Sequence, residues 1–414
     1  MAKNSFSNVA MNENNPDYLS AIKRQEALYK RQNDLRTEFS RDYNRIIFSL
    51  GYRRLKHKTQ VFFAVEDDHV CTRSEHVNLV DSVSYTIAHY LGLNTELTRA
   101  IAVGHDLGHA PFGHGGEKII DELCKKYDLP PFWHENNSLY FVDEIETLED
   151  DEHIRHNLNL TYAVRDGIIS HCGEMNQKAI HKRNNYISLK DYRHPGMYDP
   201  YTWEACVVKM SDKIAYLARD IEDAIRLHIL TEEKVEELKQ KINSIASFQF
   251  HAINNGSIVN YFILDVCSHS SPESGICLSD EAFAIMQEIM KFNYQNIYLI
   301  DRVKIHSNYV QLIVHSIFDF LYKYKQLSSI HNKNVIDELK ADKDKYPVTI
   351  SGYIHWLEKY SLMEGFERKS IYGNHIIYDF DHNEQAMAKS IIDYLAGMSD
   401  VYILKIFNEL ISFS

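Results

Sequence analysis

Apolar residues recur at three- and four-residue steps along most of the chain, a pattern typical of helices with one buried face. The clearest example runs from 73 to 91, where Val77, Val80, Val83 and Ile87 share that spacing. The same spacing predicts nine further helices, over 98–107, 117–127, 138–148, 160–171, 204–226, 231–247, 279–293, 309–323 and 385–398.

Strand patterns are few. The segment 257–266 and, less regularly, 371–378 are rich in β-branched and aromatic residues. The segment 181–200 contains several breakers, among them Pro195-Gly196 and Pro200, and is the one long stretch without a periodic pattern. We therefore expect an all-α fold with minor peripheral β elements.

Composition narrows the class of protein. The 414 residues are 44% hydrophobic, but no apolar run approaches the ~20 residues of a membrane span. The polar segment 1–17 does not have the layout of a signal peptide, so we expect a cytoplasmic protein without a membrane partner. The six cysteines are scattered without a Cys-x-x-Cys pair, which predicts free thiols in or near the core.

The net charge of −13 argues against a broad nucleic-acid-binding surface, which needs an excess of basic residues on one face. It leaves room for a local basic pocket, and 53–58 is the densest basic cluster. Binding of nucleic acid as a secondary property therefore stays open.

The run from His105 to Glu117 carries the strongest chemical signal. Its thirteen residues include three histidines, two acids and four glycines, a mixture that neither a core nor a solvated surface requires. His105 and Asp106 offer one nitrogen and one oxygen ligand to a divalent metal. The glycines allow the backbone to approach a ligand closely, and the remaining histidines and Glu117 are free to move protons. The run therefore indicates a metal-dependent hydrolase.

Two ligands do not complete a metal site. Neighbouring residues point about 100° apart on a helix, so His105 and Asp106 reach one ion only where their helix ends, which we expect near Gly108. The best upstream candidate is His76, beside the apolar stripe of its helix. The best downstream candidate is Asp212, on a polar stripe of the 204–226 helix. Such a stripe can equally be a solvated face with ion pairs.

These features occur in the same order in the HD-domain deoxynucleoside triphosphate triphosphohydrolases, which this chain resembles, in particular the bacterial dGTP triphosphohydrolase-like proteins. The resemblance rests on 42–49, 53–62, Arg73-Ser74-Glu75-His76, 105–117, Phe132-Trp133-His134-Glu135-Asn136-Asn137-Ser138, 159–161, 165–168, 211–216 and 393–400. It extends from about residue 30 to about residue 405 and is weak over 230–390.

The resemblance implies roles for individual residues. It implies that one divalent ion per subunit, Mn²⁺, Mg²⁺ or Fe²⁺, is held by His76, His105, Asp106 and Asp212. It implies proton transfer by His114 with Glu117, and further active-site positions at His109, His134 and Glu135. Phosphate contacts correspond to Arg73 and Lys213. Contacts to the deoxyribose correspond to Gln60, Val61, Tyr216 and Asp220, and Tyr298 is a candidate for stacking on the nucleoside.

One position departs from the bacterial pattern. Many bacterial members have His-Asn where this chain has His134-Glu135. That form resembles the SAM-and-HD-domain dNTPase of eukaryotes. The departure leaves the implied set of metal ligands unchanged. It leaves open which side chains pair with His134 and which substrate the protein prefers.

The resemblance also implies an organisation and partners. It implies an N-terminal extension over 1–30, an HD catalytic core over 31–230, and a helical C-terminal part over 231–414 that completes the active site and the oligomer contacts. A homo-oligomer of four or six subunits is expected. A second nucleotide is expected to act as an allosteric activator, with Arg31, Arg36 and Arg41 as candidate contacts.

The implied reaction is hydrolysis of a dNTP, with dGTP among the candidates, to a deoxynucleoside and inorganic triphosphate by water attack at the α-phosphorus. Crowding at C2′ predicts exclusion of ribonucleotides. Spacing alone does not separate the histidine that orients water from the one that protonates the 5′-oxygen. Two alternatives stay open: another HD-fold nucleotide phosphatase or cyclic-nucleotide phosphodiesterase, and a non-catalytic nucleotide-sensing oligomer.

Overall fold

The computed structural model describes residues 3–28, 33–62, 69–172 and 177–412. Helix covers 60% of the chain and strand 5%, which confirms the all-α class with minor β elements. The backbone groups into two compact units. Unit 1 consists of Met1–Ile47, Val65–Asp106 and Asn159–Lys304, and unit 2 of Phe48–Ala64, Leu107–Leu158 and Ile305–Ser414. The functional division at residues 30 and 230 stays a prediction.

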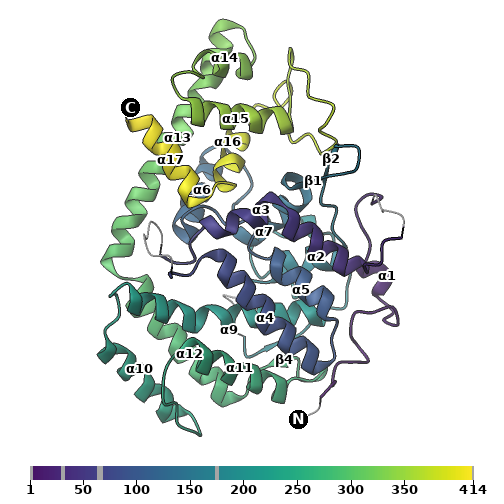
Figure 1. Ribbon diagram of the computed structural model, residues 1–414, viewed down its shortest axis with the longest axis vertical. Helices are drawn as coiled ribbons and strands as arrows, with labels where there is room; N and C mark the ends of the chain where they lie inside the picture. Colours follow the sequence, from purple (N-terminus) through teal and green to yellow (C-terminus); the bar gives the residue numbers. More distant parts are fainter. Residues whose placement is uncertain (1–2, 29–32, 63–68, 173–176, 413–414) are drawn as a thin grey trace. The chain divides into compact units, whose positions relative to one another are not determined.

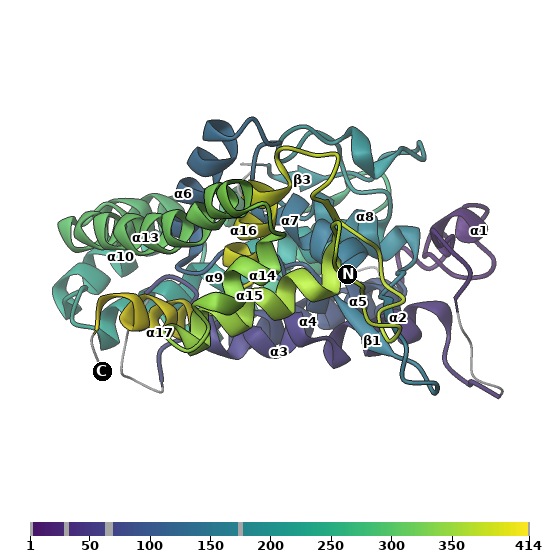
Figure 2. The same ribbon diagram turned by 90° about the horizontal axis from the view of Figure 1, so that it is seen from above.

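Unit 1 is built around four helices that pack on one another: α4 (Arg73–Leu91), α5 (Thr95–Gly104), α8 (Tyr162–Ser170) and α9 (Trp203–Arg226). Helices α4 and α5 lie side by side in both views (Figure 1 and Figure 2). The remaining elements are α1 (Tyr18–Ala21), most of α2 (Glu38–Phe48), α10 (Glu232–Ile245), α11 (Asn255–His269), α12 (Asp280–Asn293), the 3₁₀ turn η3 (Leu189–Asp191), the π-helical turn η4 (Tyr294–Tyr298), and the antiparallel pair β3 (Ala179–Ile180) and β4 (Ile276–Cys277).

Helix α4 has the bounds that its periodicity predicts, and local chemistry explains both ends. Thr72 and Glu75 form a capping box, in which each side chain accepts from the other residue's backbone N–H. Gly92 ends the helix in the left-handed conformation at φ 81°. Between these ends the helix buries its apolar stripe together with His76, so a ligand candidate lies on a well-defined helix.

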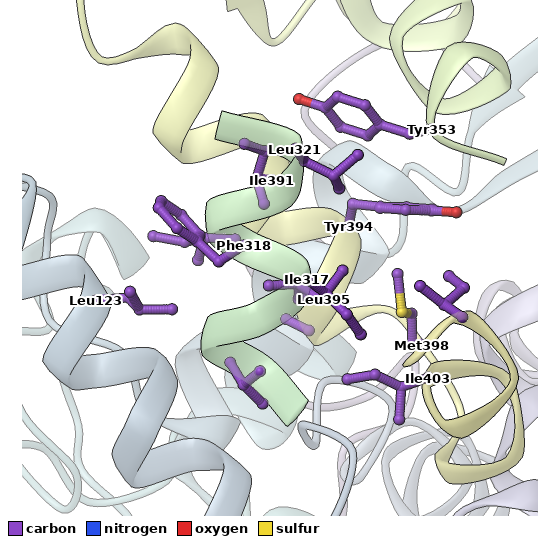
Figure 3. Close-up of a cluster of buried hydrophobic side chains, with 14 of the residues drawn as sticks. Leu123, Ile317, Phe318, Leu321, Tyr353, Ile391, Tyr394, Leu395, Met398 and Ile403 are labelled. Atoms are coloured by element: carbon purple, nitrogen blue, oxygen red, sulfur yellow. The ribbon is translucent and has the colours of Figure 1, made fainter. Parts of the chain in front are cut away.

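Unit 2 has its own core, in which side chains from six helices meet, and Figure 3 shows part of it. These helices are α6 (Gly113–Lys126), most of α13 (Asp301–His331), α14 (Val335–Ala341), α15 (Pro347–Tyr360), α16 (Ala386–Ala396) and α17 (Asp400–Ile411). The other elements are α3 (Leu50–Arg54), the 3₁₀ turn η1 (Leu55–His57), α7 (His134–Tyr140), the π-helical turn η2 (Phe141–Ile145), the antiparallel pair β1 (Thr147–Glu149) and β2 (Arg155–Asn157), and the parallel pair β5 (Ser361–Leu362) and β6 (Tyr378–Asp379).

The strand predicted over 257–266 is wrong, because this segment belongs to helix α11. Asn254 caps the helix by accepting from the backbone N–H of Ser257. The buried residues Ile258, Phe262 and Val266 follow one another at four-residue steps, so burial of one helical face outweighs their strand propensity. The strand predicted over 371–378 is also largely wrong, since only its last residue belongs to a strand, β6.

Several predicted helices have other ends than expected, and two of these differences concern the candidate site. The helix expected over 98–107 is α5, which ends at Gly104, so His105 is its C-cap rather than an interior residue. The helix expected over 138–148 begins at His134 and passes through η2 into strand β1. The segment 181–200 is irregular apart from η3, as predicted.

No disulfide joins the six cysteines, all of which are described and buried, as the sequence predicts. Within the described part of the chain, none of the helices combines the length and apolar character that crossing a bilayer requires.

Gly108 lies where its segment packs directly on the backbone of α7. A Cβ there would lie 2.1 Å from the backbone nitrogen of Ser138 and 2.3 Å from the carbonyl carbon of Asn137. The glycine N–H donates to Ser138 Oγ at 2.9 Å. Sequence reasoning assigned the glycines of this run to close approach of a ligand, whereas Gly108 is required by close approach of the protein's own backbone.

The variant Gly108→Ala is therefore expected to lose about 3 kcal/mol of unfolding free energy, or more, because backbone atoms cannot move aside. Gly115→Ala is the matched control in the same run. Apart from its chain neighbours and the nearby backbone of its own helix, no described atom lies within 4 Å of the position its Cβ would take, and alanine is the better helix former. Urea unfolding of both variants checks this. Equal unfolding midpoints would show that the segment relaxes around the extra methyl group.

Candidate metal centre and histidine group

Four side chains in unit 1 converge from three helices, and we call them the metal group: His76, His105, Asp106 and Asp212. His76 lies in the first turns of α4, His105 and Asp106 follow the end of α5, and Asp212 lies in the middle of α9. His76 Nε2 is 2.9 Å from Asp212 Oδ1 and 3.9 Å from Asp106 Oδ2. His105 Nε2 is 3.5 Å from Asp106 Oδ1 and 3.7 Å from Asp212 Oδ1. Because α5 has already ended, neighbouring residues 105 and 106 can face the same point.

The donor set fits a divalent cation. His105 Nδ1 lies 2.7 Å from the Ala102 carbonyl oxygen, which only accepts, so Nδ1 carries the proton and Nε2 presents its lone pair. That Nε2 is buried and has no hydrogen-bond partner among the described residues. Two imidazoles and two carboxylates are ligands that borderline and hard divalent ions accept. Three of the four ligand atoms, from His76, His105 and Asp212, lie within 4.8 Å of one another.

Electrostatics in the metal group follow from its burial. Burial alone raises the pKa of Asp212, but His76, which hydrogen bonds to it, and the nearby His105 and His171 outweigh burial and lower this pKa. Burial likewise disfavours a charged His76, and the Asp212 and Asp106 carboxylates outweigh it and raise the pKa of His76. Positive charge close by therefore keeps the buried Asp212 carboxylate ionised. A cation bound at this point would supply the same charge.

His171 is a further candidate ligand that sequence reasoning missed. With His105 and Asp106 it forms another set of three ligand atoms within 4.8 Å of one another. It follows the end of α8, and its Nδ1 lies 2.5 Å from the Ile168 carbonyl oxygen. That repeats the arrangement of His105 with Ala102, three residues back in each case. A histidine at the end of a second predicted helix, 160–171, was the available signal.

Two cationic side chains accompany the metal group. Arg73, three residues before His76 on α4, donates from Nη1 to Asp106 Oδ2 at 2.8 Å, and both residues are buried. Lys213 is buried next to Asp212. Burial, together with Lys209, lowers the pKa of Lys213 to about 8, although Asp212 opposes the shift. These are the two residues for which the resemblance implies phosphate contacts.

The predicted sugar contacts fall in both units. Tyr216 and Asp220 follow Asp212 on α9 at four-residue steps, in unit 1. The Tyr298 hydroxyl donates to Asp220 Oδ2 in the same unit. Gln60 and Val61 are partly buried residues of unit 2.

A second cluster lies in unit 2, and we call it the histidine group: His109, His114, Glu117 and His134. The rings of His109 and His134 stack with centroids 4.0 Å apart. Glu117 accepts from the backbone N–H of His134 at 3.2 Å and from its Nδ1–H at 3.2 Å, and His114 Nδ1 lies 3.5 Å from the same carboxylate. In the sequence, His109 follows Asp106 by three residues.

Glu117 therefore holds two histidines rather than His114 alone. Burial raises the pKa of Glu117, but the hydrogen bonds from His114 and His134 outweigh burial and hold this pKa well below its ordinary value. His134 Nε2 also lies 3.5 Å from Glu135 Oε1, so the departure from the bacterial His-Asn pattern adds a second carboxylate beside this ring. The His114 side chain is 68% exposed, whereas that of His134 is nearly buried.

The candidate contacts for an allosteric nucleotide are only partly described. Arg36 donates to Asp34, and Arg41 donates to Asp34 and Glu38. Arg31 lies outside the described residues. Of the basic cluster 53–58, Lys58 is buried and its ammonium group donates to the carbonyl oxygen of His109.

Comparison with known proteins agrees with this geometry. The HD domain family matches residues 73–217, which include all four members of the metal group. A deoxyguanosinetriphosphate triphosphohydrolase-like protein of Caldanaerobacter subterraneus subsp. tengcongensis is 34% identical over 323 residues, covering 76% of this chain and 83% of that protein. One of the same name from Desulfatibacillum aliphaticivorans is 37% identical over 291 residues, covering 69% and 74%. Another, from Clostridium tetani, is 29% identical over 386 residues, covering 92% and 87%.

These relatives match the chain along most of its length, and the matched HD domain contains the buried histidine and aspartate cluster. The chain therefore belongs to the HD-domain phosphohydrolases, in the family of the deoxyguanosinetriphosphate triphosphohydrolase-like proteins.

Proposed function

We propose that this protein hydrolyses a deoxynucleoside triphosphate to a deoxynucleoside and inorganic triphosphate in a metal-dependent reaction, with dGTP among the candidate substrates. The observation that carries the proposal is the convergence of His76, His105, Asp106 and Asp212 in the buried interior of unit 1, with Arg73 beside them. The names of the relatives support the same substrate class.

The positive side chains serve the first requirement of the reaction. In a triphosphate the α-phosphorus is surrounded by anionic oxygens, which repel an oxygen nucleophile until positive charge approaches. Arg73, three residues before His76, and Lys213, directly after Asp212, supply such positive charge. A divalent ion held by the metal group adds Lewis acidity toward a phosphoryl oxygen. Burial of the group strengthens each of these interactions because water screens them less.

The histidine group serves the second requirement, a proton for the 5′-oxygen. Water adds to the α-phosphorus and gives up a proton, the bond from phosphorus to the 5′-oxygen breaks, and this oxygen takes up a proton. His134 and His114 both direct an Nδ1–H at the ionised Glu117, which fixes the ring tautomer and leaves Nε2 of each ring to exchange protons. His109, stacked on His134, is a candidate for orienting the water.

The sugar contacts account for preference for deoxyribose in this proposal. Gln60, Tyr216 and Asp220 hold the deoxyribose and its 3′-hydroxyl, while Val61 crowds C2′. An added 2′-hydroxyl then meets an apolar contact that cannot hydrogen bond to it. An oligomer of four or six subunits and an activating second nucleotide are further parts of the proposal.

Product analysis tests the proposal. The full chain with Mn²⁺ is incubated with each dNTP and with GTP, and the products are separated by ion exchange. We expect inorganic triphosphate and deoxynucleoside from at least one dNTP, and at least about tenfold slower release from GTP than from dGTP. Release of monophosphate or pyrophosphate instead would assign another phosphohydrolase reaction on the same fold. Equal rates with GTP and dGTP would refute the sugar selection.

A further inference from the structure

A π-helical turn in unit 1 determines where Tyr298 lies. The turn η4 follows α12 directly and ends at Tyr298. At the junction, the buried Asn293 donates from Nδ2 to the carbonyl oxygen of Leu217 at 3.0 Å, which ties the turn to α9. Turns of this type are uncommon and occur frequently at functional sites. The consequence here is that a tyrosine from outside α9 reaches the polar stripe of that helix.

The Tyr298 hydroxyl donates a hydrogen bond to Oδ2 of Asp220, whereas the other carboxylate oxygen, Oδ1, receives none from a described residue. Oδ1 is buried and has no hydrogen-bond partner among the residues that the structure describes, although the Asp220 residue is only 2% exposed. A buried carboxylate oxygen without a donor is costly and uncommon, so a donor from a bound molecule is the natural partner. Burial raises the pKa of Asp220 to about 7, and the bond from Tyr298 opposes that shift.

We infer that Tyr298 is a positioning residue for substrate binding: its hydroxyl holds Oδ2 of Asp220 so that Oδ1 faces a donor hydroxyl of the substrate. The inference rests on the proposed function, in which that donor is the 3′-hydroxyl of the deoxyribose. It gives the tyrosine hydroxyl a task that differs from stacking on the nucleoside. Stacking uses the aromatic ring, which phenylalanine retains, whereas positioning requires the hydroxyl.

The test compares two substrates that differ only in the 3′-hydroxyl, dGTP and 2′,3′-dideoxyGTP. The values of kcat and KM are measured with Mn²⁺ for the wild-type protein, for Tyr298→Phe, and for the control Tyr294→Phe. Tyr294 belongs to the same turn and is 57% exposed. We expect Tyr298→Phe to lower the preference for dGTP by about 3- to 10-fold, the size of one hydrogen bond. The change is expected in KM for dGTP, with dideoxyGTP unaffected and Tyr294→Phe behaving as wild type.

A double-mutant comparison shows whether Tyr298 acts through Asp220. In an Asp220→Asn background, adding Tyr298→Phe is expected to change the preference by less than about twofold. If Tyr298→Phe lowered kcat/KM equally for both substrates, Tyr298 would have a merely structural role and the inference would be wrong. An unchanged preference for dGTP over dideoxyGTP in Tyr298→Phe would also overturn the inference. The wild-type arm separates the two proposals. If dGTP is not cleaved, the dNTP that is cleaved and its 2′,3′-dideoxy analogue replace the guanine pair, and absence of triphosphate release from all four dNTPs refutes the function itself.

Discussion

Replacing Asp212 by alanine is expected to remove the bound cation and to slow triphosphate release by about 10³- to 10⁴-fold. Asp212 Oδ1 lies within 3.7 Å of the Nε2 atoms of both His76 and His105, so it is central to the metal group. Loss of the cation removes several kcal/mol of charge stabilisation in the transition state, and each ~1.4 kcal/mol corresponds to a factor of ten in rate. Steady-state turnover and Mn²⁺ titration by calorimetry measure the two effects.

Two further variants serve as controls for this prediction. Asp212→Asn retains the shape of the side chain but not its charge, so it separates loss of the ligand from loss of the fold. Asp280→Asn is the matched control, because Asp280 is an aspartate of the same unit with a 95% exposed side chain. It should bind Mn²⁺ and turn over as the wild type does. An Asp212→Asn protein with normal metal affinity and normal turnover would show that Asp212 is not a ligand.

Replacing His134 by alanine is expected to lower kcat by about 10²- to 10⁴-fold while leaving the affinity for Mn²⁺ unchanged. This is the range that a positioned general acid or base contributes. The His134 ring is held on three sides, by Glu117 at 3.2 Å, by Glu135 at 3.5 Å and by the stacked ring of His109. A group fixed this firmly can transfer a proton without first being ordered.

The variant His114→Ala is the informative comparison. In the wild-type protein the His114 ring lies 3.5 Å from the Glu117 carboxylate but is largely exposed, so we expect a smaller loss of kcat than for His134→Ala. His134→Gln, which preserves volume and a hydrogen bond to Glu117, guards against loss of folding. If His134→Ala released its metal, the histidine group would have to be a ligand set instead. Normal turnover by that variant would exclude His134 from proton transfer.

Periodicity predicted most long helices because each buries one continuous face. Helix α4 has its predicted bounds, and α9 differs from its prediction by one residue at its start. The segment 257–266 was misread since its Ile, Val, Tyr and Phe residues favour a strand locally, whereas Asn254 starts a helix just before it. Helices α2, α15 and α17 were not predicted, although each buries one face. The helices α1, α3 and α14 have four to seven residues, which is too short for a periodic pattern to show.

The candidate site was predictable where chemistry is concentrated in the sequence. His105 and Asp106 stand in a run that no structural role requires. Helix pattern selected His76 and Asp212 as candidates, and family resemblance implied their role as ligands. His171 was missed because a single histidine at a helix end is a weak signal until that end is known to lie beside the end of another helix. The bond from Tyr298 to Asp220 was beyond prediction, since it depends on a π-helical turn that has no sequence pattern of its own.

Anomalous diffraction from a crystal grown with Mn²⁺ tests the central claim most directly. The account predicts one strong peak within bonding distance of His76 Nε2, His105 Nε2 and carboxylate oxygens of Asp106 and Asp212. A peak between His109, Glu117 and His134, the set in unit 2 whose ligand atoms also lie within 4.8 Å of one another, would contradict it. So would a crystal of active protein with no peak at the metal group.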